Sequence, residues 1–139
     1  MFSKILVPFD VSSSSEKAFD MALKLLTDKP DATLHVLSVA RTPEIADDVG
    51  TEAELEHARA YYSGNFGALA RRAKTIGIEA TFHLRAGHPA GQIVDFAEEL
   101  GVELIVMGHR GRSAIERWLV GSVARAVIDH ANCPVLVVR

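Results

Sequence analysis

Cysteine is nearly absent from this 139-residue chain, which has only Cys133. One cysteine forms no disulfide within the chain, so the sequence excludes the small secreted domains held together by disulfides and favours a reducing compartment. No apolar run approaches the roughly 18 residues that a membrane-spanning helix needs. The cationic and apolar regions of a signal peptide are also missing from the start. We therefore expect a cytoplasmic protein that does not enter a membrane.

An excess of charge of one sign is missing as well. The chain has 15 Lys and Arg residues against 18 Asp and Glu residues, which gives a formal net charge of -3. Nucleic acid is bound largely through basic surfaces, so these charges argue against it as a partner. The hydrophobic content of 48% and the charged content of 24% are typical of a globular protein. We expect one domain over residues 1–139.

Several common motifs of enzymes are not found. The chain has no G-x-x-x-x-G-K-[ST] loop, no G-x-G-x-x-G after its first apolar run and no G-x-S-x-G nucleophile elbow. Its six histidines show no H-x-x-x-H spacing and no cysteine-rich neighbourhood. These absences argue against a P-loop NTPase, a dinucleotide enzyme, a serine hydrolase and a zinc site built by the protein.

Short apolar runs alternate with helical patterns along the whole chain. The apolar runs predict five strands, at residues 4–9, 32–40, 78–86, 102–107 and 134–138. Apolar residues at helical spacing predict four helices between them, at residues 16–26, 51–76, 89–100 and 122–131. This order predicts a single-domain α/β fold, an open parallel sheet with helices on both faces and right-handed crossovers.

Capping signals place the ends of these helices. Capping-box spacing at Ser13–Glu16 and Thr51–Glu54 predicts where the first two helices start. Gly77 and Gly101 predict where the second and third helices end. In the last helix we expect Ile128 to lie on the buried face.

Two loops contain the residue types that a nucleotide site needs. In open parallel sheets, ligands bind beyond the carboxyl ends of the strands, where the strand order reverses. The loop after the first strand offers Asp10, an acceptor suited to ribose hydroxyls, and the loop after the fourth offers glycine backbone with Arg110 and Arg112, which suit phosphates. Gly121 and Ser122 then open the last helix, whose free N–H groups attract anions.

The same residues also have explanations that involve no ligand. The glycines at 108 and 111 could serve only a tight turn, and Asp10 could serve only as a helix cap. Arg110 and Arg112 could be solvated surface charges. His109 is a candidate for a catalytic base near the phosphates, because imidazole is the side chain that most often serves as a general base.

The glycine spacing resembles the ATP-binding motif of the universal stress protein family, G-x2-G-x9-G-S. Gly108, Gly111, Gly121 and Ser122 match it, and the likeness extends over nearly the whole chain, including "ILVPFD", "LHVLSV" and "GSVARAVIDHANCPVLVVR". The resemblance implies a Rossmann-like fold of the adenine nucleotide alpha hydrolase type, with strand order 3-2-1-4-5. It also implies that ATP is the ligand, with any Mg2+ or Mn2+ carried by the nucleotide.

The binding pattern of the family carries over at matching positions. The resemblance implies that Asp10 bonds the ribose or adenine side, that Pro8 and Phe9 shape the wall, and that Val36 meets the base through its backbone. Met107 would lie at the edge of the pocket. The residues implied around the phosphates and at the helix start are Gly108, His109, Arg110, Gly111, Arg112, Gly121, Ser122 and Val123. Val11 departs from the pattern of the family, because many members have glycine at the position after the aspartate.

The resemblance also implies a homodimer joined through the final strand, "PVLVVR". The expected function is that of an ATP-binding stress-response module whose nucleotide state is read by another protein, of unknown identity. We expect no dedicated catalysis. Two alternatives stay open, namely a nucleotide-free dimeric stress protein that acts through protein contacts and a weak ATPase that uses His109.

Overall fold

The computed structural model describes residues 2–41, 48–109 and 121–139. Strands and helices alternate along them in the order β1 (Lys4–Pro8), α1 (Ser13–Leu26), β2 (Thr33–Arg41), α2 (Asp48–Thr75), β3 (Ala80–Gly87), α3 (Pro89–Leu100), β4 (Leu104–Gly108), α4 (Gly121–His130) and β5 (Val135–Val138). In this part of the chain, no helix has the length and apolar character required to cross a membrane.

The five strands form one parallel sheet in the order β3-β2-β1-β4-β5. This confirms the predicted fold class and strand order. Strand β1 is central, with Val7 beside Val36 of β2 and Leu6 beside Ile105 of β4. The chain leaves β1 toward β2 on one side and later returns to β4 on the other. The carboxyl ends of β1 and β4 therefore flank the point where the strand order reverses, at which α/β sheets bind their ligands.

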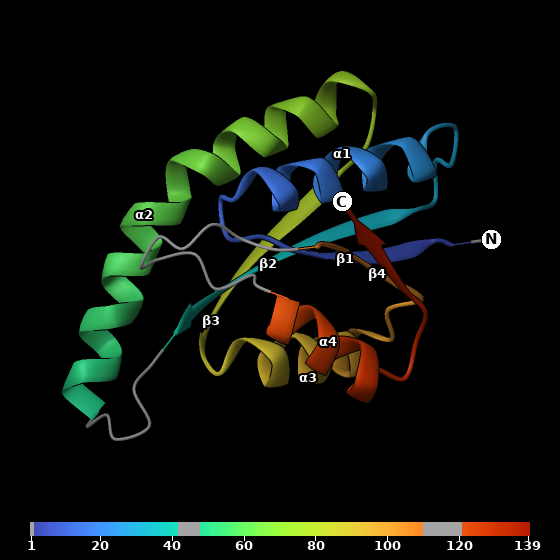
Figure 1. The fold of residues 1–139 in the computed structure, drawn as a ribbon. Coiled ribbons are helices and arrows are strands. Elements are labelled where there is room, and N and C mark those ends of the chain that lie inside the picture. The colour runs from blue at the N-terminus through green and yellow to red at the C-terminus, as the bar shows by residue number, and fades with distance from the viewer. Residues whose placement is uncertain (1, 42–47, 110–120) are drawn as a thin grey trace.

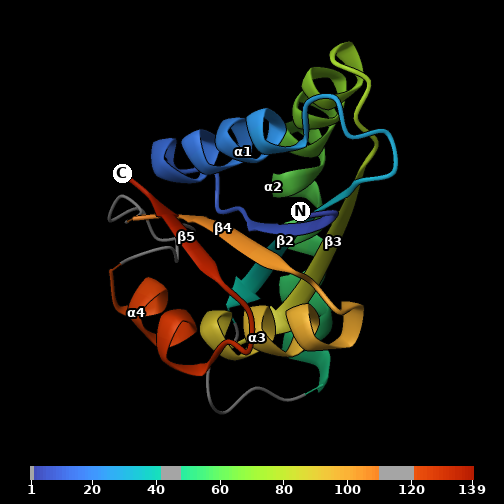
Figure 2. The same cartoon turned by 90° about the vertical axis from the view of Figure 1, so that its right-hand side faces the viewer.

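Helices cover both faces of the sheet, as predicted. Helices α1 and α2 lie on one face, and α3 and α4 lie on the other (Figures 1 and 2). Successive residues of β1 supply both layers, because Ile5 and Val7 pack in the cluster with Phe19 of α1, whereas Leu6 packs in the cluster with Ile93 of α3. Each of these side chains is fully buried. Burial of one such side chain contributes about 1.5–3 kcal/mol to the free energy of unfolding.

Helix α1 starts by a different cap from the predicted one. The residue at the N-cap is Ser12, whose side chain accepts a hydrogen bond from the Ser15 N–H at 3.2 Å. Glu16 does not close the predicted box with Ser13, because its carboxylate pairs with Arg72 of α2 at 3.1 Å. A run of four serines offers several equivalent caps. Asp10 selects Ser12 by accepting hydrogen bonds from its N–H and its hydroxyl.

The other helix ends agree with the predicted ones in part. Helix α2 begins at Asp48, before the predicted start, so Thr51–Glu54 lies inside the helix and the capping-box prediction there is wrong. The predicted stops are confirmed, since Gly77 has a φ of 78° and Gly101 caps α3 with a φ of 65°.

The prediction that Ile128 is buried is wrong, because 52% of the residue is exposed. The buried face of α4 consists of Val123, Ala124 and Val127. Helix α4 packs on α3 and on the edge strand β5, at the end of the sheet. No described element covers the outer side of α4. Helical spacing alone therefore predicted burial for a residue, Ile128, that lies on this uncovered side.

Two histidines meet on the α3 face of the sheet. The Nδ1 atom of His35 in β2 lies 3.1 Å from the Nε2 atom of His83 in β3, and the His83 ring lies 4.6 Å from the ring of Phe96. Burial lowers the pKa of both imidazoles from the ordinary value of 6.5. The charge of Lys4 further lowers the pKa of His35, and the charges of His35 and Arg85 further lower that of His83.

This pair predicts how stability depends on pH. Because both folded-state pKa values lie below the unfolded value, the unfolded chain binds more protons as the pH falls. We expect the melting temperature to be highest above about pH 6.5 and to decrease from there toward the lowered pKa values. Melting curves at about pH 7.5 and about pH 5.5 measure this decrease. His83→Gln should reduce the decrease and the exposed His88→Gln should not; equal decreases in both variants would contradict the assignment.

Candidate functional site

Nine of the residues predicted for the site belong to three segments, at the end of β1, at the end of β4 and at the start of α4. Pro8, Phe9 and Asp10 follow one another at the end of β1, and Met107, Gly108 and His109 do so at the end of neighbouring β4. Gly121, Ser122 and Val123 form the start of α4. Residues 110–112, which include the predicted Arg110, Gly111 and Arg112, lie outside the described residues.

Asp10 is fully buried and holds the start of α1. Its Oδ1 atom accepts hydrogen bonds from the Ser12 N–H at 3.0 Å and from the Ser12 hydroxyl at 2.5 Å. Ser12 in turn is the N-cap of α1. Asp10 is therefore not itself the helix cap. Its carboxylate positions Ser12, which is the cap. A ligand hydroxyl at Asp10 would meet a carboxylate whose orientation is already set.

Phe9 and Val36 lie inside the sheet rather than at its rim. The Phe9 N–H donates to the Leu37 carbonyl oxygen at 2.9 Å, and the Ser38 hydroxyl donates to the Phe9 carbonyl oxygen at 2.6 Å. Val36 is fully buried in β2 between Val7 of β1 and Phe82 of β3. The backbone of Phe9 is thus engaged with β2, and its ring belongs to the core beneath the site.

Gly108 is a glycine because α1 packs directly against it. A Cβ atom at this position would lie 2.7 Å from the carbonyl carbon and 2.8 Å from the carbonyl oxygen of Ser14, and closer still to the Ser14 hydroxyl. Real Cβ contacts essentially never fall below 3.0 Å. The contact between β4 and α1 is therefore sufficient by itself to require glycine at this position.

Gly121 is the opposite case. A Cβ atom there would have no atom within 4 Å, as far as the described residues show, and the residue is exposed at the first position of α4. Neither packing nor a left-handed backbone within the described structure requires glycine here. The first N–H groups of a helix have no partner inside the helix, and they carry the positive end of its dipole. Such groups attract anions, and no described residue occupies the space beside the Gly121 Cα atom.

The start of α4 borders a hollow of about 620 Å³. Among the residues that line it are His109, Gly121, Ser122, Arg125, Ile128 and Val137. The backbone N–H of His109 donates to the Val138 carbonyl oxygen at 2.7 Å, so this N–H is not available to a phosphate. Val123 does not face the hollow but is buried in the same core cluster as Met107. The structure thus joins three of the predicted phosphate residues in one hollow.

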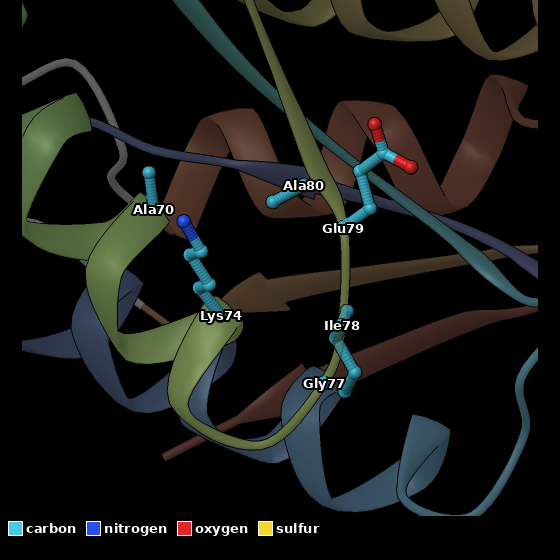
Figure 3. Close-up of a pocket in the computed structure, with 6 residues that line it drawn as sticks. All are labelled: Ala70, Lys74, Gly77, Ile78, Glu79 and Ala80. Carbon is cyan, nitrogen blue, oxygen red and sulfur yellow. The ribbon is translucent and has the colours of Figure 1, made fainter.

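A second hollow, of about 490 Å³, lies far from these residues in the fold. It is lined by Ala70, Lys74, Gly77, Ile78, Glu79 and Ala80 (Figure 3). These residues belong to the end of α2 and to the amino end of β3. None of them belongs to the predicted site, and open α/β sheets bind ligands at the opposite, carboxyl edge. Within the described ranges, no group of three or more His, Cys, Asp or Glu side chains could hold a metal ion.

Val11 has a strained backbone between Asp10 and the cap of α1. Its φ is 68°, in the left-handed region that a β-branched residue rarely adopts. The partly buried side chain packs against the clusters that contain Phe19 of α1 and Tyr62 of α2. The backbone here thus has the conformation that suits glycine, although the residue is valine. Such strain persists where surrounding contacts hold it, and it is common at ligand sites.

Two variants measure this strain. Val11→Gly and Val11→Ala both remove the two methyl groups, but only alanine keeps a Cβ atom at positive φ. We expect the glycine variant to have a free energy of unfolding about 1 kcal/mol higher than that of the alanine variant. At an ordinary φ, glycine is the less stable of the two by about 0.5–1 kcal/mol. Urea unfolding of both variants shows which one has the higher free energy of unfolding. A more stable alanine variant would contradict the strained backbone at Val11.

Three residues beside the candidate site were not predicted from the sequence. Ser14 lies against Gly108, Ser38 fixes the Phe9 carbonyl, and Arg125 lines the hollow at α4. Arg125 had a usable signal, because it follows Gly121 at the spacing that places two residues on one helix face. Ser14 belongs to the serine run after Asp10, but its contact with Gly108 joins segments far apart in the sequence, as does the hydrogen bond from Ser38 to Phe9.

Comparison with known proteins identifies relatives of this chain and of its fold. The family described as Universal stress protein family matches residues 1–139. Universal stress protein YxiE of Bacillus subtilis (strain 168) is 33% identical over 154 residues, covering 100% of both chains. The solved structure of hypothetical protein MJ0577 has a TM-score of 0.83 and 30% identity, covering 99% of this chain and 96% of that one. A universal stress protein in complex with cAMP has a TM-score of 0.69 and 26% identity, covering 99% and 97%.

Proposed function

Because the chain belongs to the universal stress protein family, we propose that it binds an adenine nucleotide, ATP, at the carboxyl edge of its sheet. The bound nucleotide would control how the protein interacts with a regulatory partner. A related structure holds cAMP, which is an adenine nucleotide. The fold positions the ends of β1 and β4 where such ligands bind in open parallel sheets.

The observation that carries this proposal is the open start of α4. Gly121, Ser122 and His109 line one hollow, and no described atom occupies the space where a Cβ atom of residue 121 would lie. Helix N-termini of this kind bind phosphate groups through their free N–H groups. The Ser122 hydroxyl would add a donor, and Asp10 would accept from the ribose or the adenine side. Mg2+ or Mn2+ carried by the nucleotide would neutralise part of the phosphate charge.

The same proposal includes a cytoplasmic homodimer. Strand β5, Val135–Val138, is at the edge of the sheet, and its outer side has no partner strand among the described residues. An edge strand offers unpaired N–H and C=O groups to a second chain. Pairing of two β5 strands would join two copies and leave both nucleotide sites at carboxyl edges. The partner protein that reads the nucleotide state stays unidentified.

One set of observations favours the nucleotide-free alternative. Gly108 is explained by its contact with Ser14, and the Asp10 carboxylate already holds Ser12. In that case the protein would act through surface contacts alone, and its glycines at the site would be structural. The weak ATPase rests only on the His109 imidazole beside the hollow.

A thermal shift experiment tests the proposed function. ATP at a hundred times its dissociation constant should raise the free energy of unfolding by about 2.7 kcal/mol, because ligand bound only to the folded state stabilises it. Mass spectrometry of small molecules released by heating fresh protein identifies any nucleotide that copurifies. A normal dimer with an unchanged melting temperature at millimolar ATP would support the nucleotide-free alternative.

A further inference from the structure

Arg125 adds an unpaired positive charge to the hollow at α4. Its side chain is exposed and lines the hollow together with His109, Gly121 and Ser122. Within the described ranges it forms no ion pair, although Asp129 lines the same hollow one helical turn further along. By contrast, Arg72 and Arg85 are each paired with carboxylates. The guanidinium of Arg125 is thus available to an anion that enters the hollow.

The geometry of α4 directs Arg125 toward the start of the helix. Residues four apart lie on the same face, and Cα–Cβ bonds tilt toward the N-terminus of the helix. Arg125 therefore extends over the turn that contains Gly121 and Ser122. The axial distance from residue 121 to residue 125 is about 6 Å, which the long arginine side chain spans. A guanidinium binds two phosphate oxygens at once, which an ammonium group does not do.

The proposed function assigns the two ends of a nucleotide to different elements of the fold. Asp10, at the end of β1, suits the ribose or base, and the start of α4 suits phosphate. The phosphate chain would then lead away from Asp10 toward α4, so the β- and γ-phosphates would lie nearest Arg125. The single phosphate of AMP, attached directly to the ribose, would remain nearer Asp10 and beyond reach of the guanidinium.

On the basis of the proposed function, we propose that Arg125 binds the terminal phosphates of a nucleoside polyphosphate and so makes the site prefer ATP to AMP. Arg125 is then a residue that determines specificity by phosphate number. Asp129 limits the preference, because its carboxylate repels the same phosphates. His109, at the other side of the hollow, contributes through its imidazole to both ligands.

Calorimetric titration of the full chain with ATP, ADP and AMP tests this assignment. Wild type should bind ATP about tenfold or more tightly than AMP. Arg125→Ala should weaken ATP binding about tenfold, equivalent to about 1.4 kcal/mol, and change AMP binding by less than twofold. Arg125→Lys should recover part of the loss. Arg59→Ala, which removes one exposed charge from α2, should change neither affinity by more than twofold.

The outcomes separate this inference from the function on which it rests. A selective loss of ATP binding in Arg125→Ala supports the inference. An equal loss for ATP and AMP, or no loss, would overturn it and leave nucleotide binding intact. Failure of wild type to bind any of the three nucleotides would overturn the proposed function and this inference with it.

Discussion

Gly108→Ala is expected to lower the free energy of unfolding by about 3 kcal/mol, the upper end of the range for overpacking a protein core. The new methyl group would lie 2.7 and 2.8 Å from main-chain atoms of Ser14, so α1 would have to move away from β4. Phe19 and Ala22, both fully buried in the core on that face, would move with it. Urea unfolding measures the loss.

Two controls isolate the cause of this loss. Gly121→Ala introduces the same methyl group where no described atom lies within 4 Å. Alanine is the better helix former, so this variant should be as stable as wild type or up to about 1 kcal/mol more stable. Ser14→Ala combined with Gly108→Ala should not restore stability, because the conflict with the Ser14 main chain remains. Equal stability of Gly108→Ala and Gly121→Ala would contradict the contact.

Gly121→Asp is expected to abolish the stabilisation by ATP without disturbing the fold. The Asp side chain has room at the exposed start of α4, where a carboxylate stabilises a helix by about 0.3–1 kcal/mol. The same carboxylate would occupy the position proposed for phosphate and repel it. At an ATP concentration that stabilises wild type by about 2.7 kcal/mol, the melting temperature of the variant should not change.

Gly121→Asn is the matched control for this variant. Asparagine has nearly the same size as aspartate and no charge, so it separates repulsion from steric exclusion. We expect Gly121→Asn to keep part of the thermal shift with ATP. An aspartate variant that responds to ATP as wild type does would exclude phosphate from the start of α4.

The sheet and its layers were predictable from the sequence because their causes are local. Buried strands appear as apolar runs, and the alternation with helices leaves parallel pairing as the natural arrangement. Gly77 and Gly101 were correctly predicted to end their helices, because the left-handed backbone at a helix end favours glycine within a few residues of the helix itself.

The features that the sequence did not predict depend on which of several possible contacts form. Four consecutive serines lie at the start of α1, and the hydrogen bonds from Ser12 to Asp10 select Ser12 as the cap. Gly108 matched a ligand-binding motif, yet its contact is Ser14, from the other end of the chain. The exposure of Ile128 follows from the place of α4 at the end of the sheet. In the candidate site, the sequence predicted that the ends of β1 and β4 are neighbours, while only the packing distinguishes Gly108 from Gly121.

The central claim is that an adenine nucleotide lies at the carboxyl edge of the sheet with its phosphates at the start of α4. Titration of 15N-labelled protein with ATP, followed through backbone amide resonances, tests the claim most directly. We predict the largest shifts at Gly121, Ser122 and the segment from Asp10 to Ser12. Amides of Gly77 and Ile78, at the second hollow, should not shift. Shifts confined to that second hollow, or none at any concentration of ATP, would contradict the account.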